Sequence, residues 1–221
     1  NTAGIAAGKT VGVAPAAQLY AVRVLNALGF GSEAAVIYGI EWCINQDVDV
    51  MNMSLGSTFR SLLEEQACRA ALQKGILIAA AAGNSGYGAD YPAAYEGVTA
   101  VAAVDRNNEH ANFSNIWETN DIAAPGVEIY SAHPGGFKKL SGTSMATPHV
   151  AGVAALGKSL QRIAGQNLEE VIKETAEKIG DPNDPEYESI YGAGLVRADQ
   201  VVKVLIKNYE RRKAYATRKS K

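Results

Sequence analysis

The chain has 221 residues, of which 47% are hydrophobic and 20% are charged, and its formal net charge at neutral pH is −2. These proportions are typical of one globular domain with a sizeable core. No apolar run approaches the ~20 residues of a membrane span, and two cysteines are too few for a disulfide framework. The sequence therefore argues against a membrane protein and against a disulfide-rich scaffold.

Predicted strands and helices alternate along the first half of the chain. Apolar, strand-like runs occupy residues 17–25, 48–54 and 76–82, and a helix is predicted at 61–74, between the second and third runs. A further helix is predicted at residues 33–45, where apolar side chains recur with the helical period. These side chains share one face of the helix: Val36, Ile37, Ile40 and Ile44.

The second half continues with an apolar strand run at residues 98–104 and a hairpin at 128–140. Three more helices are predicted, at residues 144–160, 168–178 and 198–213. Continuous apolar strands between helices predict an α/β fold with a mostly parallel sheet covered on both faces. Ligands in such sheets bind beyond the carboxyl ends of the strands, so we expect a functional site near Ser54 and Gly83.

Ser144 stands before an apolar helix, within a run of small residues. The run reads Leu140, Ser141, Gly142, Thr143, Ser144, Met145, Ala146, Thr147, Pro148, His149, Val150, Ala151 and Gly152. A serine at a helix N-terminus often only caps the helix. It can also attack a carbonyl group while its backbone N–H helps to hold the resulting oxyanion.

The run around Ser144 resembles the nucleophile motif of subtilisin-like serine proteases, and further segments resemble that family in the same order. They include residues 11–15, 19–25, 39–42, 52–56, 80–84, 91–92, 113–114, 124–126 and 191–195. The resemblance implies a subtilisin-like three-layer fold and a serine endopeptidase that hydrolyses peptide bonds of polypeptide substrates. It also slightly favours an extracellular location.

The resemblance is incomplete at the start of the chain. The family orders its catalytic triad Asp, His, Ser, whereas residues 1–7 already resemble the helix that follows the family's histidine. We therefore expect the triad Asp and His on a missing N-terminal segment or propeptide, and little activity from this chain alone. His149 lies about 140° around the helix from Ser144, and His110 and His133 look like surface histidines, so none is expected to replace the triad histidine.

Asn84 follows the strand at residues 76–82. The segment Gly83-Asn84-Ser85-Gly86 is also a good turn sequence, and a turn alone would explain it. The resemblance assigns Asn84 as the side-chain donor of the oxyanion hole, beside the backbone N–H of Ser144. The chemistry needs a neutral donor that acts when charge develops in the transition state.

The resemblance also implies a cleft for an extended substrate. Its walls are formed by two segments, Gly29, Phe30 and Gly31, and Ser54, Leu55 and Gly56. One wall of the primary specificity pocket is formed by Ala81, Ala82 and Gly83. Val36 and Leu55, with Glu33 at the rim, would form an apolar subsite. Asp90 aligns with the floor of the pocket, where a carboxylate would favour Lys or Arg; a solvated loop aspartate is the equal alternative.

No cofactor is expected to be required. The short segment between Ala7 and Val13 offers too few oxygen atoms for the calcium loop that many relatives carry there. A weaker cation site at backbone carbonyls near Ala93, Tyr95 and Val98 remains open by resemblance. Cys43 and Cys68 are expected to be free thiols inside the domain, and no metal site is assigned.

The last nineteen residues are basic. Residues 203–221 hold eight basic residues and one glutamate, whereas residues 1–202 are acidic overall. We expect a peptidase domain at 1–202 and a basic helical extension at 203–221, which packs on the acidic body or is solvated. Because the extension has no interleaved aromatic residues beyond Tyr209 and Tyr215, nucleic acid is not an expected partner.

Two other functions remain alternatives to the endopeptidase. A pseudoprotease, or peptide-binding scaffold, would keep the cleft and lose the chemistry. A different serine hydrolase would need the Gly-x-Ser-x-Gly pattern, which is absent around Ser144. A scaffold needs neither Ser144 nor Asn84, so the presence of both favours the endopeptidase.

Overall fold

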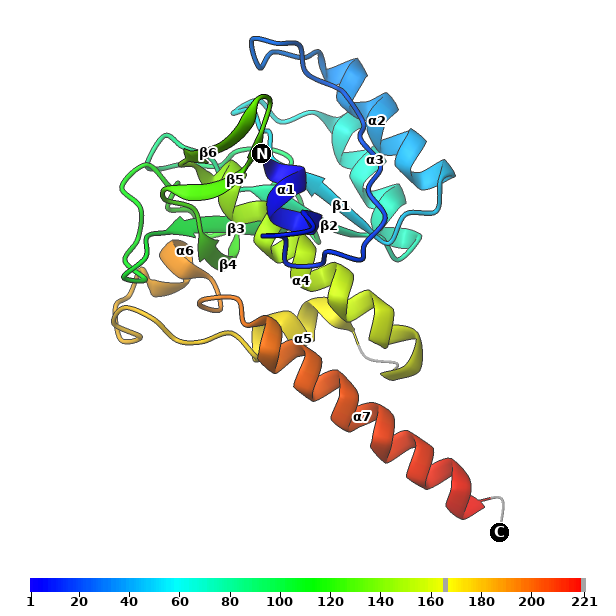
Figure 1. Ribbon diagram of the computed structural model, residues 1–221. Coiled ribbons are helices and arrows are strands. Elements are labelled where there is room, and N and C mark those ends of the chain that lie inside the picture. Colours follow the sequence, from blue (N-terminus) through cyan, green and yellow to red (C-terminus); the bar gives the residue numbers. More distant parts are fainter. Residues whose placement is uncertain (165–166, 220–221) are drawn as a thin grey trace.

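The fold is built on a four-stranded parallel sheet, seen in a computed structural model that describes residues 1–164 and 167–219 (Figure 1). The strands lie in the order β1-β2-β3-β4: Val50–Met53, Leu77–Ala81, Thr99–Val104 and Asn120–Pro125. An antiparallel hairpin of β5 (Ile129–His133) and β6 (Gly136–Leu140) follows, as predicted. The helices are α1 Thr2–Ala7, α2 Glu33–Asn45, α3 Leu62–Gln73, α4 Thr143–Ala164, α5 Leu168–Glu174, α6 Tyr187–Tyr191 and α7 Ala198–Lys219.

Helices cover both faces of the sheet, so the predicted three-layer α/β fold is confirmed. Alternate residues of a strand point to opposite faces. Leu77 and Ala79 of β2 therefore join the apolar cluster beneath α4, α5 and α7, whereas Ile78 and Ala80 join the cluster beneath α2 and α3. The long central helix α4 packs against all four strands and carries the residues of the Ser144 run to the sheet.

The predicted strand at residues 17–25 is wrong. The segment forms no strand or helix and belongs to no sheet, and Leu19, Tyr20 and Val22 are 37–53% exposed. A cavity lies between this segment and β1. A β-strand needs a neighbouring strand for its hydrogen bonds, and apolar composition alone does not supply one.

The later elements differ from the prediction at their ends. The helix predicted at 168–178 ends at Glu174, because Glu177 exchanges backbone hydrogen bonds of 2.8 Å with Leu195. β4 and α6 were not predicted. β4 begins with two polar residues, and its Asp121 accepts a hydrogen bond from the backbone N–H of Ala100 and pairs with Lys173 at 2.6 Å.

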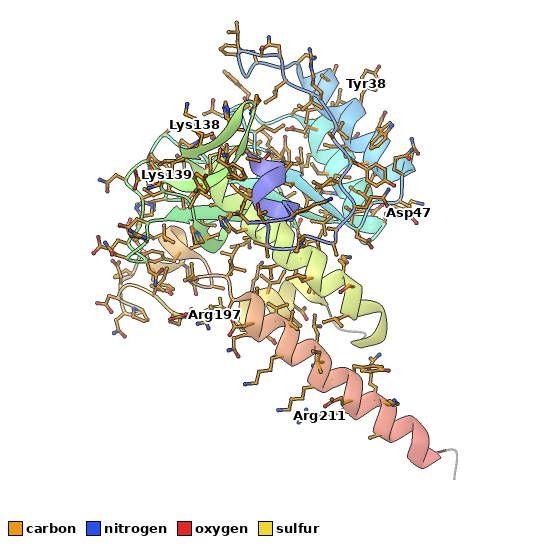
Figure 2. All side chains as sticks on the ribbon, viewed as in Figure 1. Tyr38, Asp47, Lys138, Lys139, Arg197 and Arg211 are labelled. Atoms are coloured by element: carbon orange, nitrogen blue, oxygen red, sulfur yellow. The ribbon has the colours of Figure 1, made fainter. Side chains whose placement is uncertain are left out.

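The C-terminal helix α7 packs on α4 at its start and then leaves the body (Figure 1). Val201 and Leu205 are fully buried, whereas Arg211 is exposed and points away from the body in Figure 2. The helix crosses the predicted boundary at residues 202/203 without a break, and the division into two parts stays a prediction. The side chains of residues 216–221 lie outside the described part of the chain. Within residues 1–164 and 167–219, no helix combines the length and apolarity that a membrane crossing requires.

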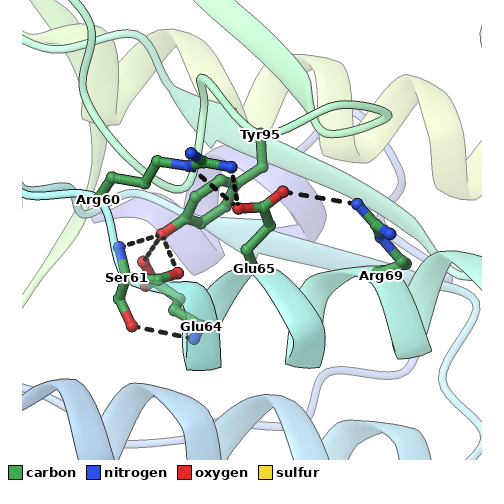
Figure 3. A network of polar contacts seen from close by, with 6 residues as sticks. All are labelled: Arg60, Ser61, Glu64, Glu65, Arg69 and Tyr95. Carbon is green, nitrogen blue, oxygen red and sulfur yellow. Dashed lines mark hydrogen bonds and ion pairs between the residues drawn. The ribbon is translucent and has the colours of Figure 1, made fainter.

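A polar network holds the start of α3 against the loop that carries Asp90 (Figure 3). The hydroxyl of Tyr95 accepts a hydrogen bond from the Ser61 backbone N–H at 3.0 Å and lies 2.9 Å from the Ser61 carbonyl and 3.0 Å from Glu64 Oε2. Glu64 and Tyr95 are both buried, and burial raises the pKa of the Glu64 carboxyl. Ser61 also caps α3 through its side chain, so one tyrosine fixes this helix end.

Replacing Tyr95 by phenylalanine is expected to lower the free energy of unfolding by about 1–3 kcal/mol. The loss of one hydroxyl leaves the Ser61 N–H and the buried Glu64 carboxyl without their shared partner. Tyr91→Phe is the matched control, because Tyr91 packs on Tyr95 with ring centroids 4.8 Å apart and no described hydrogen bond involves its hydroxyl. Urea unfolding of the wild type, Tyr95→Phe and Tyr91→Phe measures the free energy of unfolding of each protein. Equal losses of stability from the two substitutions would show that the hydrogen bonds of the Tyr95 hydroxyl do not stabilise the fold.

Candidate active site

Ser144 is the second residue of α4 and lies at the carboxyl edge of the sheet, beside the end of β1. Two hydrogen bonds join it to Ser54. The Ser144 hydroxyl donates to the Ser54 carbonyl at 3.3 Å, and the Ser54 hydroxyl donates to the Ser144 carbonyl at 2.8 Å. Ser144 is half-buried, so its hydroxyl is positioned by β1 and still borders solvent.

Pro148 explains why the Ser144 carbonyl is available to Ser54. In a regular helix this carbonyl would accept a hydrogen bond from the N–H four residues later. Residue 148 is a proline inside α4 and has no N–H. The hydroxyl of Ser54 supplies the missing donor, and Asn52 Nδ2 donates to Ser54 Oγ at 3.0 Å. Because Pro148 leaves this carbonyl free, Ser54 can hydrogen-bond to it and connect the start of α4 to the segment after β1.

Asn84 follows β2 and binds the start of α4 through its side-chain oxygen. Its Oδ1 accepts hydrogen bonds from the Thr143 backbone N–H at 2.9 Å and from Thr143 Oγ1 at 3.0 Å. A backbone N–H can only donate, so the amide oxygen faces α4 and the NH₂ group faces the other way. Within the described residues, no hydrogen bond is made by this NH₂ group or by the backbone N–H of Ser144.

The NH₂ group of Asn84 and the backbone N–H of Ser144 are therefore two available hydrogen-bond donors at the N-terminus of α4, beside the Ser144 hydroxyl. The partial positive charge of the helix end adds to the attraction for an anion. Neutral donors held in place by the fold can stabilise an oxyanion without reorganising. This arrangement can support nucleophilic attack on a carbonyl if a base accepts the Ser144 proton.

Two supporting residues were not singled out from the sequence. Thr143 is fully buried, and its Oγ1 also accepts a hydrogen bond from the Gly83 N–H at 3.3 Å. Asn115 is 1% exposed and holds the loop after Asn84, accepting from the Ser85 N–H at 2.7 Å and donating to the Gly88 carbonyl at 3.0 Å. The only signal in the sequence is a polar residue in an otherwise apolar or loop context, which does not reveal its partners.

Asp90 lies between the predicted wall segments that contain Gly56 and Gly83. A Cβ atom on Gly83 would overlap Asp90 Oδ2, and a Cβ atom on Gly56 would lie 3.5 Å from Asp90 Cβ and 3.6 Å from Oδ2. Burial raises the pKa of the Asp90 carboxyl, and within the described residues its side chain makes no hydrogen bond or ion pair. Ala81 and Ala82, the other predicted wall residues, are 4% exposed.

The remaining predicted cleft residues lie further out. Gly29, Phe30 and Gly31 belong to a loop before α2, in which Asn26 Oδ1 accepts from the backbone N–H of Phe30 at 3.1 Å and the Phe30 ring is 72% exposed. Leu55 and Val36 pack together in the apolar cluster under α2 and α3. Ser61 donates a short hydrogen bond to Glu33 across the rim. The structure thus brings Ser54, Gly56, Gly83, Asn84, Asp90 and Ser144 close to one another. The assignment of residues 29–31 to the cleft wall stays a prediction.

The three histidines all hydrogen-bond to backbone carbonyls. His149 Nδ1 lies 3.0 Å from the Met145 carbonyl of its own helix, and His133 Nδ1 lies 3.1 Å from the Pro134 carbonyl. His110, expected at the surface, is half-buried, with Nε2 3.0 Å from the Ser114 carbonyl and its ring edge-on to Tyr191. Among the described residues, no histidine is hydrogen-bonded to Ser144.

Burial of His149 makes the stability of the fold depend on pH. Burial lowers the pKa of His149 in the folded protein, so the unfolded chain binds this proton at a higher pH than the folded chain. Stability is then highest above the unfolded pKa of ~6.5 and falls as the pH drops through that value, by at most ~1.4 kcal/mol per pH unit. The predicted result is that His149→Gln shows a shallower loss between pH 7 and pH 5.

Urea unfolding at each pH measures this slope. His133→Gln, on the exposed hairpin, is the control and should keep the wild-type slope. Burial also lowers the pKa of His110, so part of the slope remains in His149→Gln. An unchanged slope in that variant would contradict the assignment.

The suggested cation site near Ala93, Tyr95 and Val98 is a buried turn after Asp90. All three residues are 2–4% exposed, and the Tyr95 carbonyl accepts the Val98 N–H at 3.1 Å. Within the described ranges, no group of three or more acidic, histidine or cysteine side chains could hold a metal ion. The backbone-carbonyl site stays a prediction.

The parallel sheet, its two helical layers and the serine at the start of α4 define a subtilisin-like α/β protein. The family model described as the Subtilase family matches residues 1–194. The chain therefore belongs to the subtilase family.

Curated relatives and solved structures agree with this assignment. The chain is 50% identical to "Thermostable alkaline protease" of Halalkalibacterium halodurans over 191 residues, which cover 85% of this chain and 51% of that protein. It is 46% identical to "Subtilisin Savinase" of Lederbergia lenta, with 86% and 69% covered. The structure of the "Patellamide maturation protease PatA" matches with a TM-score of 0.80 and 30% identity over 90% of this chain and 78% of that one. The chain thus spans about half the length of the first of these relatives.

Proposed function

We propose that Ser144 is the nucleophile of a serine endopeptidase whose general base, with its orienting acid, is supplied by polypeptide outside residues 1–221. The observation that carries the proposal is the fixed orientation of Asn84, whose oxygen is held by Thr143. Its NH₂ group and the Ser144 N–H are then the two donors of an oxyanion hole. Family membership supports a peptide bond as the bond that is hydrolysed.

In the proposed reaction the Ser144 oxygen attacks the substrate carbonyl carbon while the base takes the hydroxyl proton. The carbonyl oxygen becomes an oxyanion and receives hydrogen bonds from Asn84 and from the Ser144 N–H. Collapse breaks the C–N bond, and the leaving amine takes the proton from the base. Water then hydrolyses the acyl-enzyme by the same steps in reverse order, which regenerates Ser144.

The substrate would lie as an extended strand between residues 29–31 and residues 54–56. Its side chain before the scissile bond would enter the space bordered by Ala81, Ala82 and Asp90. Polypeptides are therefore the proposed substrates, and no cofactor is part of the mechanism. An extracellular site of action is proposed from the resemblance alone.

A comparison of residues 1–221 with the complete enzyme tests the proposal. Both are incubated with a fluorophosphonate probe and with casein. The complete enzyme should be labelled and turn casein over, whereas residues 1–221 alone should be nearly inert, because an unassisted serine is a weak nucleophile. Rapid labelling and full turnover by residues 1–221 would place the base within this chain and contradict the proposal. Tight casein binding without turnover by the complete enzyme would favour the scaffold.

Asp90 is expected to set a preference for basic side chains. Its unpaired carboxylate would gain a charged partner in a partly desolvated pocket when Arg or Lys enters. A hydrogen bond to a charged group contributes about 1.5–3 kcal/mol, so Asp90→Asn should lower the kcat/KM ratio of Arg over Leu peptides by about tenfold to a hundredfold. The measurement uses the complete enzyme and matched peptides that differ only at the residue before the scissile bond. An unchanged ratio would leave Asp90 as a solvated loop residue.

A further inference from the structure

The C-terminal helix α7 continues well beyond its last buried side chain, which is Leu205. Among the described side chains of residues 206–215, Asn208 is half-buried and all the others are exposed. A helix of this length without tertiary packing is only marginally stable in water. The family model ends at residue 194, so α7 lies outside the part of the chain that is shared with the family, and the shared fold does not explain it.

Three cations follow one another along the exposed side of α7. Lys203, Lys207 and Arg211 recur every four residues, which places them within about 80° around the helix. All three are exposed, Arg211 points away from the body (Figure 2), and in the described part of the chain none of them forms an ion pair. Like charges four residues apart destabilise a helix, so an anionic surface bound to these residues would stabilise α7. We call these three residues the basic stripe.

The turn that leads into α6 is acidic. Residues 181–188 contain no lysine or arginine, and their acidic side chains are all exposed: Asp181, Asp184, Glu186 and Glu188. Asp181 Oδ1 accepts a hydrogen bond from the Asn183 N–H at 2.9 Å, and Asp184 Oδ1 accepts one from the Glu186 N–H at 2.9 Å. These bonds shape the turn without neutralising its charge. We call residues 181–188 the acidic turn.

The acidic turn is held in a fixed shape. Tyr187 is 4% exposed, and its hydroxyl accepts a hydrogen bond from the Ile179 N–H at 3.3 Å. The neighbouring cation, Lys178, lies over the Tyr187 ring, with its nitrogen 4.8 Å from the ring centre. Pro182 and Pro185 restrict the backbone further. A preformed surface loses little conformational entropy when it binds a partner.

The basic stripe and the acidic turn do not meet within one copy of the chain. Figure 1 shows α6 and the free end of α7 on opposite sides of the lower part of the molecule. α7 is one unbroken helix from Ala198 to Lys219, and it contains no proline or glycine at which it could kink back toward α6. The two oppositely charged surfaces are therefore available to a second copy.

We propose that the basic stripe of α7 binds the acidic turn of a second copy of this chain. The dimer would have two-fold symmetry, because the same contact then forms twice. Direct pairing of two α7 helices is disfavoured, because residues 203–221 hold eight basic residues and one glutamate. An anionic membrane fits less well, because an interfacial helix needs a wide apolar face and residues 206–215 contain one large aliphatic side chain, Ile206.

The salt dependence of dimerisation is the first test. Exposed charges attract over a Debye length, which falls from ~10 Å at 0.1 M salt to ~3 Å at 1 M. Sedimentation velocity is measured on the complete protein, in a Ser144→Ala background that excludes self-cleavage. It should show a dimer whose dissociation constant rises by about tenfold or more across this salt range. A monomer at the lower salt and millimolar protein would overturn the proposal, and so would a dimer that salt does not weaken.

Charge reversal identifies the two surfaces. The stripe variant carries Lys203→Glu, Lys207→Glu and Arg211→Glu, and the turn variant carries Glu186→Lys and Glu188→Lys. Each variant alone should dimerise about tenfold or more weakly, because like charges then face each other. An equimolar mixture of the two should form a heterodimer, because each stripe then faces a turn of opposite charge.

The matched control carries Lys9→Glu, Arg106→Glu and Lys138→Glu. It reverses three exposed charges on other parts of the chain and should dimerise like the wild type. Circular dichroism checks that the variants fold, and the turn variant, which leaves α7 unchanged, decides alone if the stripe variant does not. A carbodiimide joins amines to carboxylates, and it should link Lys207 to the acidic turn in the dimer fraction only.

Three further results would overturn the proposal. Equal weakening in the control variant would show that net charge alone governs association. Unchanged dimerisation of the stripe variant, or no heterodimer in the mixture, would place the interface elsewhere. A monomer that binds vesicles of anionic phospholipid through the basic stripe would make a membrane the partner. None of these results depends on whether Ser144 is a nucleophile, so failure of the dimer is separable from failure of the proposed function.

Discussion

Replacement of Ser144 by alanine in the complete enzyme is expected to abolish turnover. The substitution removes the only oxygen that could form the acyl-enzyme in the proposed mechanism. Loss of the nucleophile costs subtilisin about 10⁶-fold in kcat, and a loss of that order is expected here. Steady-state hydrolysis of a chromogenic peptide measures it.

Ser85→Ala is the matched control for this experiment. Ser85 is exposed on the loop after β2, next to Asn84, and the substitution removes a hydroxyl from the same side of the molecule. Turnover should remain near the wild-type value. Substantial activity in Ser144→Ala would mean that another residue attacks the substrate, and the site at the start of α4 would lose its assigned role.

Replacement of Asn84 by alanine is expected to lower kcat by about 10²–10³-fold, with little change in KM. The oxyanion exists only in the transition state and the intermediate, so its donor contributes little to binding of the ground state. The magnitude corresponds to about 2.7–4 kcal/mol and is the loss known for the corresponding asparagine of subtilisin. The measurement is the separate determination of kcat and KM.

Asn84→Asp separates the oxyanion role from the structural one. Asn84 Oδ1 accepts two hydrogen bonds from Thr143 at the start of α4, and loss of a helix cap costs about 0.5–2 kcal/mol of stability. Aspartate keeps an acceptor for Thr143 but has no NH₂ group. We expect near-normal thermal stability with the full loss of kcat. Normal turnover in Asn84→Asp would leave Asn84 as a cap only.

The fold and the neighbourhood of the site follow from sequence patterns that depend on local chemistry. Alternating apolar strands and helices predict the layers, and the ends of parallel strands predict that Ser54 and Asn84 meet at one edge. α2 and α3 begin one residue after Ser32 and Ser61, whose side chains accept hydrogen bonds from their first turns. Such helix starts are encoded within three or four residues.

The features that the sequence does not reveal depend on distant neighbours. Residues 17–25 have a strand composition but no adjacent strand, so the prediction of a strand there is wrong. The bond from Thr143 to Asn84 joins residues 59 positions apart, and neither residue type identifies the other. Asp121 lies in a strand, and Lys173 and the Ala100 N–H hold its carboxylate there, whereas composition alone suggests a loop.

Identification of the residue that a fluorophosphonate modifies in the complete enzyme tests the central assignment most directly. The labelled protein is digested, and the modified peptide is identified by mass spectrometry. The account predicts one label, on Ser144, formed more slowly in Asn84→Ala because the probe's oxygen also uses the oxyanion hole. A label on a different serine, or labelling of Ser144 at the same rate in Asn84→Ala, would contradict the account.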